Sequence, residues 1–140
     1  MTLAFVDVTL PRPMAPASSA FSAPFWRALA EGRFLTARCG GCAELHFPPR
    51  PICPRCHHDK TTWVELSGRG VLYSRTRVHA AGGTFAAFAP YSVGIVDLAE
   101  GVRLLTRLLP SASALPLDSP VRLVVLRHPD GPLFAAEAVG

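Results

Sequence analysis

All four cysteines of this 140-residue chain fall in two CxxC pairs, and this pattern constrains the fold more than any other feature. The pairs span residues 39–42 and 53–56, with a ten-residue loop between them. Two thiolates three positions apart converge on one ion only if the backbone between them turns tightly, and the glycines and the proline within the pairs favour such turns. Two turns of this kind complete a tetrahedron of sulfur, so the sequence predicts a zinc ribbon.

We expect one structural Zn2+ held by Cys39, Cys42, Cys53 and Cys56. Because sulfur fills all four positions, no site remains for a reacting water or substrate. His57 and His58 follow the last cysteine, but four thiolates already satisfy zinc. The alternative is two disulfides in a secreted domain. The absence of a recognisable secretory signal and the rarity of structural disulfides within CxxC pairs argue against it.

The composition indicates a subunit with a partner. Hydrophobic residues make up 49% of the chain and charged residues 17%, against a typical charged fraction of about 25%. Permanent subunits have such a surface because a partner covers part of it, although a GC-rich genome would produce a similar composition. No apolar run reaches the roughly 18 residues of a membrane span, so we expect no membrane partner and a reducing cytoplasm.

The net charge gives little support to nucleic-acid binding. The formal value is +4, and the −2 carried by four thiolates and one Zn2+ reduces it to +2. A binder of single strands needs a basic groove with spaced stacking aromatics, and few aromatics fall in the expected strands. The sequence also lacks a lone cysteine, a serine elbow or a pair of carboxylates that would mark a catalytic nucleophile and its base.

We divide the chain into four segments: an arm at 1–20, a helix region at 21–35, a zinc ribbon at 36–66 and a barrel domain at 67–140. The arm has no helix or strand period, so we expect it to be flexible or bound to a partner. Pro24 and Gly32 suit the two ends of a short amphipathic helix over 23–31. The aromatic side of this helix, Phe25 and Trp26, is a candidate partner contact. Its alternative role is to cover the chain's own core.

The C-terminal half has the two-residue alternation that is typical of β-strands. We expect strands at 70–79, 91–98, 102–109, 121–127 and 134–139, separated by tight turns. Five short strands predict a mainly β fold with a five-stranded OB-fold barrel, and a small sandwich is the alternative. The loop 80–90 carries Phe85 and Phe88, which are candidates either for a partner contact or for packing over the barrel.

Beyond the cysteines, a series of short motifs resembles the DUF35 family in order and spacing. The resemblance runs from residue 22 to the C-terminus. Its motifs are FW (25–26), EG (31–32), RCxxC (38–42), FPPR (47–50), CPxC (53–56), Trp63, SGRG (67–70), YSxTxVH (73–79), PY (90–91) and EGVR (100–103). The resemblance implies an N-terminal helix, a rubredoxin-like zinc ribbon and an OB-fold.

The resemblance also implies a function. Members of the DUF35 family accompany thiolase-fold enzymes, including thiolases, acyltransferases and aldolases, and help to form or shield the acyl-CoA site. Some relatives are fused to hydratase-like domains. The chain is therefore expected to be a noncatalytic accessory subunit. The alternatives are a single-stranded nucleic-acid-binding module and a free-standing acyl-CoA binding protein.

If a CoA thioester is a shared ligand, its phosphates need cations. Arginine is suited to this because its guanidinium makes paired, charge-assisted hydrogen bonds. Arg38 and Arg50 lie beside the metal pairs, and Arg75 and Arg77 alternate along the first barrel strand. These four arginines are the candidate CoA contacts, and Phe47 with its two prolines is expected to pack the ribbon against the barrel.

Overall fold

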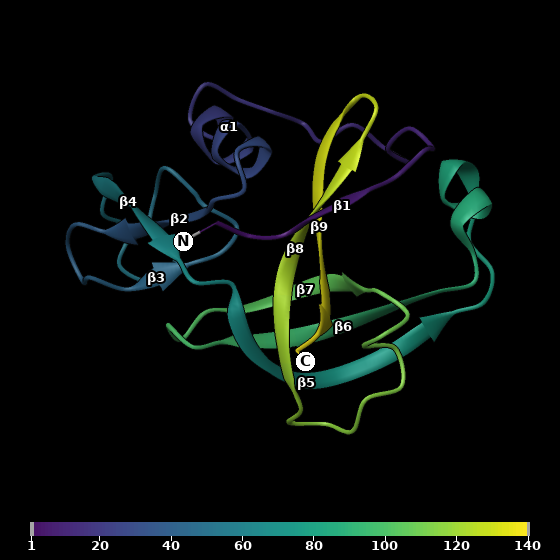
Figure 1. Cartoon of the computed structure of the whole chain (residues 1–140). Coiled ribbons are helices and arrows are strands. Elements are labelled where there is room, and N and C mark those ends of the chain that lie inside the picture. Colours follow the sequence, from purple (N-terminus) through teal and green to yellow (C-terminus); the bar gives the residue numbers. More distant parts are fainter. Residues whose placement is uncertain (1, 140) are drawn as a thin grey trace.

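The computed structural model describes residues 2–139 and combines a closed barrel, a smaller three-stranded sheet and one short α-helix (Figure 1). The elements in chain order are β1 (Phe5–Asp7), α1 (Ala23–Ala30), β2 (Phe34–Cys39), β3 (Leu45–His46), β4 (Thr61–Leu66), β5 (Arg69–Val78), the 3-10 helix η1 (Gly83–Phe88), β6 (Tyr91–Leu98), β7 (Arg103–Leu108), β8 (Pro120–His128) and β9 (Gly131–Ala138). No helix within the described residues is long and apolar enough to cross a membrane.

Strands β5 to β9 form the barrel. Strand β5 pairs antiparallel with β6 and β8, β6 pairs with β7, and the parallel pair β7–β9 together with the antiparallel pair β8–β9 closes the ring. Buried and partly exposed residues alternate along β6, as closure around a core requires. The predicted five-stranded barrel is confirmed, and the sandwich alternative is excluded.

The predicted barrel strands agree with the observed ones to within one residue at most ends, and β6 agrees at both. The exception is β9, which begins at Gly131 rather than at the predicted residue 134. The sequence predicts a turn over residues 128–132, because this stretch contains a glycine and two prolines. The turn is in fact only Pro129 and Asp130, and Pro132 pairs with Arg127 near the start of the strand, where a missing N–H is tolerated.

Helix α1 confirms the predicted helix, ending one residue earlier than expected. Proline occupies its first turn, where no backbone N–H partner is needed. Gly32 follows the helix with a φ of 84°, and the N–H of Arg33 donates to the carbonyl oxygen of Ala28 at 2.9 Å. This left-handed residue ends the helix because glycine adopts a positive φ without steric cost.

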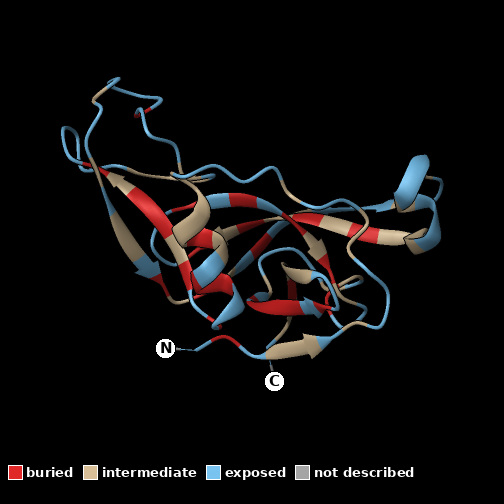
Figure 2. Ribbon diagram, turned by 90° about the horizontal axis from the view of Figure 1, so that it is seen from above, coloured by how far each residue is buried: buried red, intermediate tan, exposed pale blue. Residues whose placement is uncertain are grey.

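Four phenylalanines join the helix, the ribbon and the barrel into one core. The ring of Phe34 on β2 lies 5.4 Å from Phe25, 5.3 Å from Phe47 and 5.2 Å from Phe134 on β9, measured between centroids. Phe47 also lies 5.9 Å from Phe134, so it packs the ribbon against the barrel as predicted. Figure 2 shows buried segments on the ribbon and barrel strands, whereas η1 is exposed at the far end of the molecule.

The N-terminal segment, which shows no helix or strand period in the sequence, contains one short strand. Strand β1 adds in parallel to β8, and Leu3, only 7% exposed, belongs to the main core. Further along, Arg12 binds Asp130 through its backbone N–H at 2.9 Å and through Nη2 to the carbonyl oxygen at 2.7 Å. The sequence did not reveal β1 because three residues are too few to display a period.

Candidate metal centre and arginine sites

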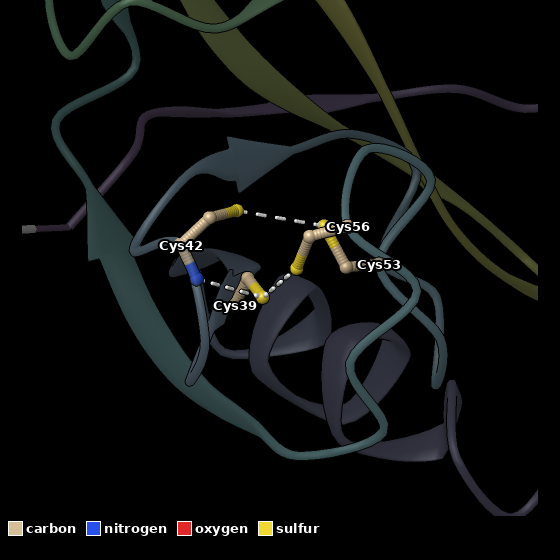
Figure 3. Close-up of side chains that lie close together, drawn as sticks. All are labelled: Cys39, Cys42, Cys53 and Cys56. Atoms are coloured by element: carbon tan, nitrogen blue, oxygen red, sulfur yellow. Dashed lines mark hydrogen bonds between the residues drawn. The ribbon is translucent and has the colours of Figure 1, made fainter.

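The four cysteines converge at one end of the ribbon, as the sequence predicts (Figure 3). Their sulfur atoms all lie within 4.8 Å of one another, with 3.4 Å between Cys39 and Cys56 and 3.8 Å between Cys42 and Cys53. A tetrahedron with a Zn–S bond of about 2.3 Å has S···S edges of about 3.8 Å. The four thiols therefore fit a tetrahedral Zn2+ with little movement.

The two CxxC turns have the same construction. In each, the residue after the second cysteine adopts a φ of 63° and donates its N–H to the carbonyl oxygen of the first cysteine, as Ala43 does to Cys39 at 3.0 Å and His57 does to Cys53 at 2.9 Å. The turns also direct N–H groups at sulfur, with Gly41 N 3.2 Å from Cys39 Sγ. Such donors stabilise a thiolate ligand.

The thiols of Cys39 and Cys42 have different pKa values, because their hydrogen bonds and burial differ. The N–H of Cys42, followed by that of Gly41, stabilises the Cys39 thiolate and lowers the pKa of Cys39 to about 6. At Cys42 the N–H of Glu44 acts to lower the pKa, but desolvation and the neighbouring sulfurs outweigh it and raise the pKa to about 11. A Zn2+ ion bound by these residues would supply the positive charge that allows all four sulfurs to be thiolates together.

The neighbouring histidines act as structural residues around the cysteine cluster. A Cβ added to Gly41 would lie 2.7 Å from the His58 ring, so glycine allows this ring to lie against the first turn. His58 Nδ1 accepts a hydrogen bond from Lys60 N at 3.1 Å. An ion pair of 3.0 Å between Arg55 and Glu44 links the two turns.

The structure does not bring the four arginine candidates together. Arg38 and Arg50 lie in the ribbon region, whereas Arg75 and Arg77 lie on β5. Arg38 Nη1 donates to the carbonyl oxygen of Ala43 at 3.0 Å, and Arg75 Nε donates to that of Leu115 at 2.9 Å. Arg50 is exposed, and Arg77 lines a polar hollow at the ends of β5 and β7.

The aromatic candidates for partner contact differ from one another. Phe25 is 3% exposed and belongs to the core, and Trp26 packs against that core 4.9 Å from Phe25, so the structure favours the own-core alternative for this side of α1. Phe85 and Phe88 lie in η1 and are partly buried. They line a pocket with Tyr91 on β6 and do not project into solvent as free rings.

Sequence reasoning missed two features of the barrel surface. One is Arg107 on β7, which lines the pocket beneath η1 although the nearest other lining residue in the sequence, Val93, is 14 positions away. The other, which we call the outer patch, consists of Val71, Tyr73 and Leu105, whose exposed fractions are 38%, 48% and 66%. The alternation along β5 and β7 is the signal that places these residues on an outward face.

The architecture and the cysteine cluster define a zinc-ribbon/OB-fold protein. Comparison with known families agrees: residues 26–62 match the ChsH2 rubredoxin-like zinc ribbon domain, and residues 63–133 match the ChsH2 C-terminal OB-fold domain. The chain belongs to this DUF35 family of ChsH2-type proteins. A zinc-ribbon domain with four clustered cysteines supports a structural zinc ion.

Relatives with known names include scaffold and enzyme subunits. A DUF35 domain-containing scaffold protein of Methanocaldococcus jannaschii is 40% identical over 82 residues, covering 56% of this chain and 57% of the relative. The benzoylsuccinyl-CoA thiolase subunit BbsA of Thauera aromatica is 35% identical over 88 residues, covering 63% and 60%. The chain thus spans less than two thirds of the length of both curated relatives.

A solved structure resembles the whole chain more fully. A chain in the structure of the Ltp2-ChsH2(DUF35) aldolase superimposes with a TM-score of 0.76 and 33% sequence identity, covering 89% of this chain and 98% of that chain. The similarity includes both the ribbon and the barrel, since neither alone extends over so much of the sequence.

Proposed function

We propose that this chain is a noncatalytic accessory subunit that assembles with a thiolase-superfamily enzyme in the cytoplasm and helps to form or shield its acyl-CoA site. The observation that carries the proposal is the similarity to nearly the full length of a chain from the Ltp2-ChsH2(DUF35) aldolase. The kinship with a scaffold protein and with a thiolase subunit supports it.

The outer patch is the proposed contact with the catalytic subunit. Its three exposed apolar side chains lie on β5 and β7, the two strands that flank β6, and Ile95 of β6 pairs with Leu105. Arg103 stacks over the Tyr73 ring at 3.8 Å, which adds a cation beside apolar carbon. Exposed aromatic, aliphatic and arginine side chains in one place are typical of an interface centre.

The structure favours two of the four candidate arginines as CoA contacts. Arg38 and Arg75 bind backbone carbonyl groups of this chain, so their N–H groups are partly occupied. Among the described residues, no acceptor binds the guanidinium of Arg50 or Arg77, and these two are the better candidates for the CoA phosphates. In a complex, replacing Arg77 with glutamine should raise the KM for the CoA thioester, whereas Arg69→Gln at the other end of β5 should not.

The assembly is tested by purifying the tagged full chain from its native host and identifying the retained proteins by mass spectrometry. We expect a thiolase-superfamily enzyme in stoichiometric amount. The variant Leu105→Asp places a charge in the outer patch and should lose this enzyme. Met14→Asp is the matched control, because Met14 is 65% exposed but lies in the segment between β1 and α1, outside the patch.

Other outcomes would change the proposal. Retention of the enzyme by Leu105→Asp would contradict the outer patch as the contact. Recovery of nucleic acid in place of an enzyme would favour a nucleic-acid-binding module. If no partner is recovered and the isolated chain binds a CoA thioester tightly, a free-standing acyl-CoA binding protein is the better description.

A further inference from the structure

A pocket of about 220 Å³ lies between η1 and the outer side of the barrel, away from the cysteine cluster. Phe85 and Phe88 of η1, Tyr91 and Val93 of β6 and Leu133 of β9 supply most of its wall. A dry cavity of roughly 150 Å³ with similar walls is enough to hold benzene. This pocket therefore has room for a short aliphatic chain or a substituted ring.

One charged side chain, Arg107, lines this otherwise apolar pocket. Its guanidinium lies 5.3 Å from the centroid of Phe88 and 5.8 Å from that of Tyr91. The aromatic rings contact the flat face of the Arg107 guanidinium, whereas its N–H donors point outward from the edge of the plane. Among residues 2–139, no carboxylate lies within 4 Å of Arg107, and no acceptor forms a hydrogen bond with its guanidinium.

The local environment makes this unpaired cation costly. Burial lowers the pKa of Arg107, and only the nearby Tyr91 opposes the shift. The acidic residues near other barrel arginines are already engaged, as Asp97 is with Arg103 and Glu137 is with Arg122. An anion entering the pocket would restore charge pairing to a partly desolvated guanidinium.

A second hollow adjoins the pocket at the same arginine. Arg107 and Tyr91 line both spaces, and Arg77, Ser92 and Ser113 contribute to the second. The wall thus changes from apolar to polar at Arg107. A ligand with an apolar body and an anionic end matches this change, because its charge would lie at the junction while its carbon chain occupies the pocket.

We propose that the pocket beneath η1 binds a small apolar carboxylate, with its chain against Phe88 and Val93 and its carboxylate on Arg107. This site lies on the barrel and is formed by residues of this chain alone. It does not require the partner of the proposed assembly, so the isolated chain can be tested directly.

The test is titration of the zinc-loaded full chain with sodium octanoate, followed by calorimetry and by backbone NMR shifts. Octanamide is the neutral control with the same carbon chain. We expect saturable octanoate binding at up to millimolar concentration, shifts centred on η1, β6 and β7, and affinity at least about tenfold weaker for octanamide. Arg107→Gln should lose the difference between the two probes, and Arg107→Lys should restore part of it.

Two further variants separate the pocket from general charge effects. Arg122→Gln removes a barrel arginine that pairs with Glu137 and should leave octanoate binding unchanged. Val93→Phe fills the pocket without removing Arg107 and should abolish binding of both probes. Equal affinity for octanoate and octanamide, shifts centred elsewhere, or no saturable binding by the folded chain would each overturn the proposal.

Discussion

Replacing Phe34 with alanine should destabilise the ribbon and the barrel together. Phe34 is fully buried, and its ring lies between 5.2 and 5.4 Å from three other phenylalanines of α1, the ribbon and β9. Removing a buried phenylalanine side chain costs about 3–5 kcal/mol. At roughly 3–4 °C per kcal/mol for a chain of this size, the Tm should fall by about 10–20 °C.

The assay is thermal and urea unfolding of the zinc-loaded protein, followed separately by tryptophan fluorescence, which reports the helix and ribbon, and by far-UV circular dichroism. Because the ribbon and barrel share the core around Phe34, both signals should shift together in one transition. Leu105→Ala is the control, since this leucine is 66% exposed and its truncation should change the Tm little. A barrel transition that stays at the wild-type temperature in Phe34→Ala would refute the shared core.

The metal centre and the ion pairs give three further expectations. Cys39→Ser or Cys53→Ser should lose zinc and unfold the ribbon, because structural zinc contributes about 10 kcal/mol or more of folding free energy; one zinc per chain and unchanged circular dichroism in either variant would contradict this. His57→Gly should raise the free energy of unfolding by about 1 kcal/mol in urea titrations, because the φ of 63° is costly for a residue with a Cβ, whereas Asp59→Gly, where φ is not positive, should lower it. The hydrogen bond from Arg103 lowers the pKa of Asp97 in the folded state. The pair therefore stabilises the fold above the unfolded pKa of about 4, and this stabilisation is lost as the pH falls through the lower folded pKa. Arg103→Gln should weaken the pH dependence of the free energy of unfolding in acid, and an unchanged acid profile would count against the pair.

The metal centre could be predicted because its information is local. The spacing of two CxxC pairs limits the backbone to tight turns, and four sulfurs define both the coordination number and the closed character of the site. The structure adds what spacing does not contain, namely the positive φ at Ala43 and His57 and the contact of His58 with Gly41. These depend on the path of the loop between the pairs.

The barrel strands were also predictable, because alternation and turn residues mark them one by one. The errors occur where long-range pairing decides the structure. Strand β1 forms because it pairs with β8. The first residues of β9 are in strand conformation because they pair with the end of β8. Arg107 appeared as one of many strand arginines, since its pocket is formed by η1, β6 and β9, which the sequence does not place together.

Strand β2 connects the metal centre to the rest of the molecule. Its last residue, Cys39, belongs to the cysteine cluster, and its first, Phe34, lies at the centre of the phenylalanine cluster shared with the barrel. Five residues of strand rise span only about 17 Å, and β4 pairs along the whole length. Zinc binding should therefore stabilise the barrel as well as the ribbon. It would fix the end of β2, and β2 positions Phe34, whose ring packs the ribbon against the barrel. Loss of zinc should for this reason impair partner binding even though the outer patch lies on different strands.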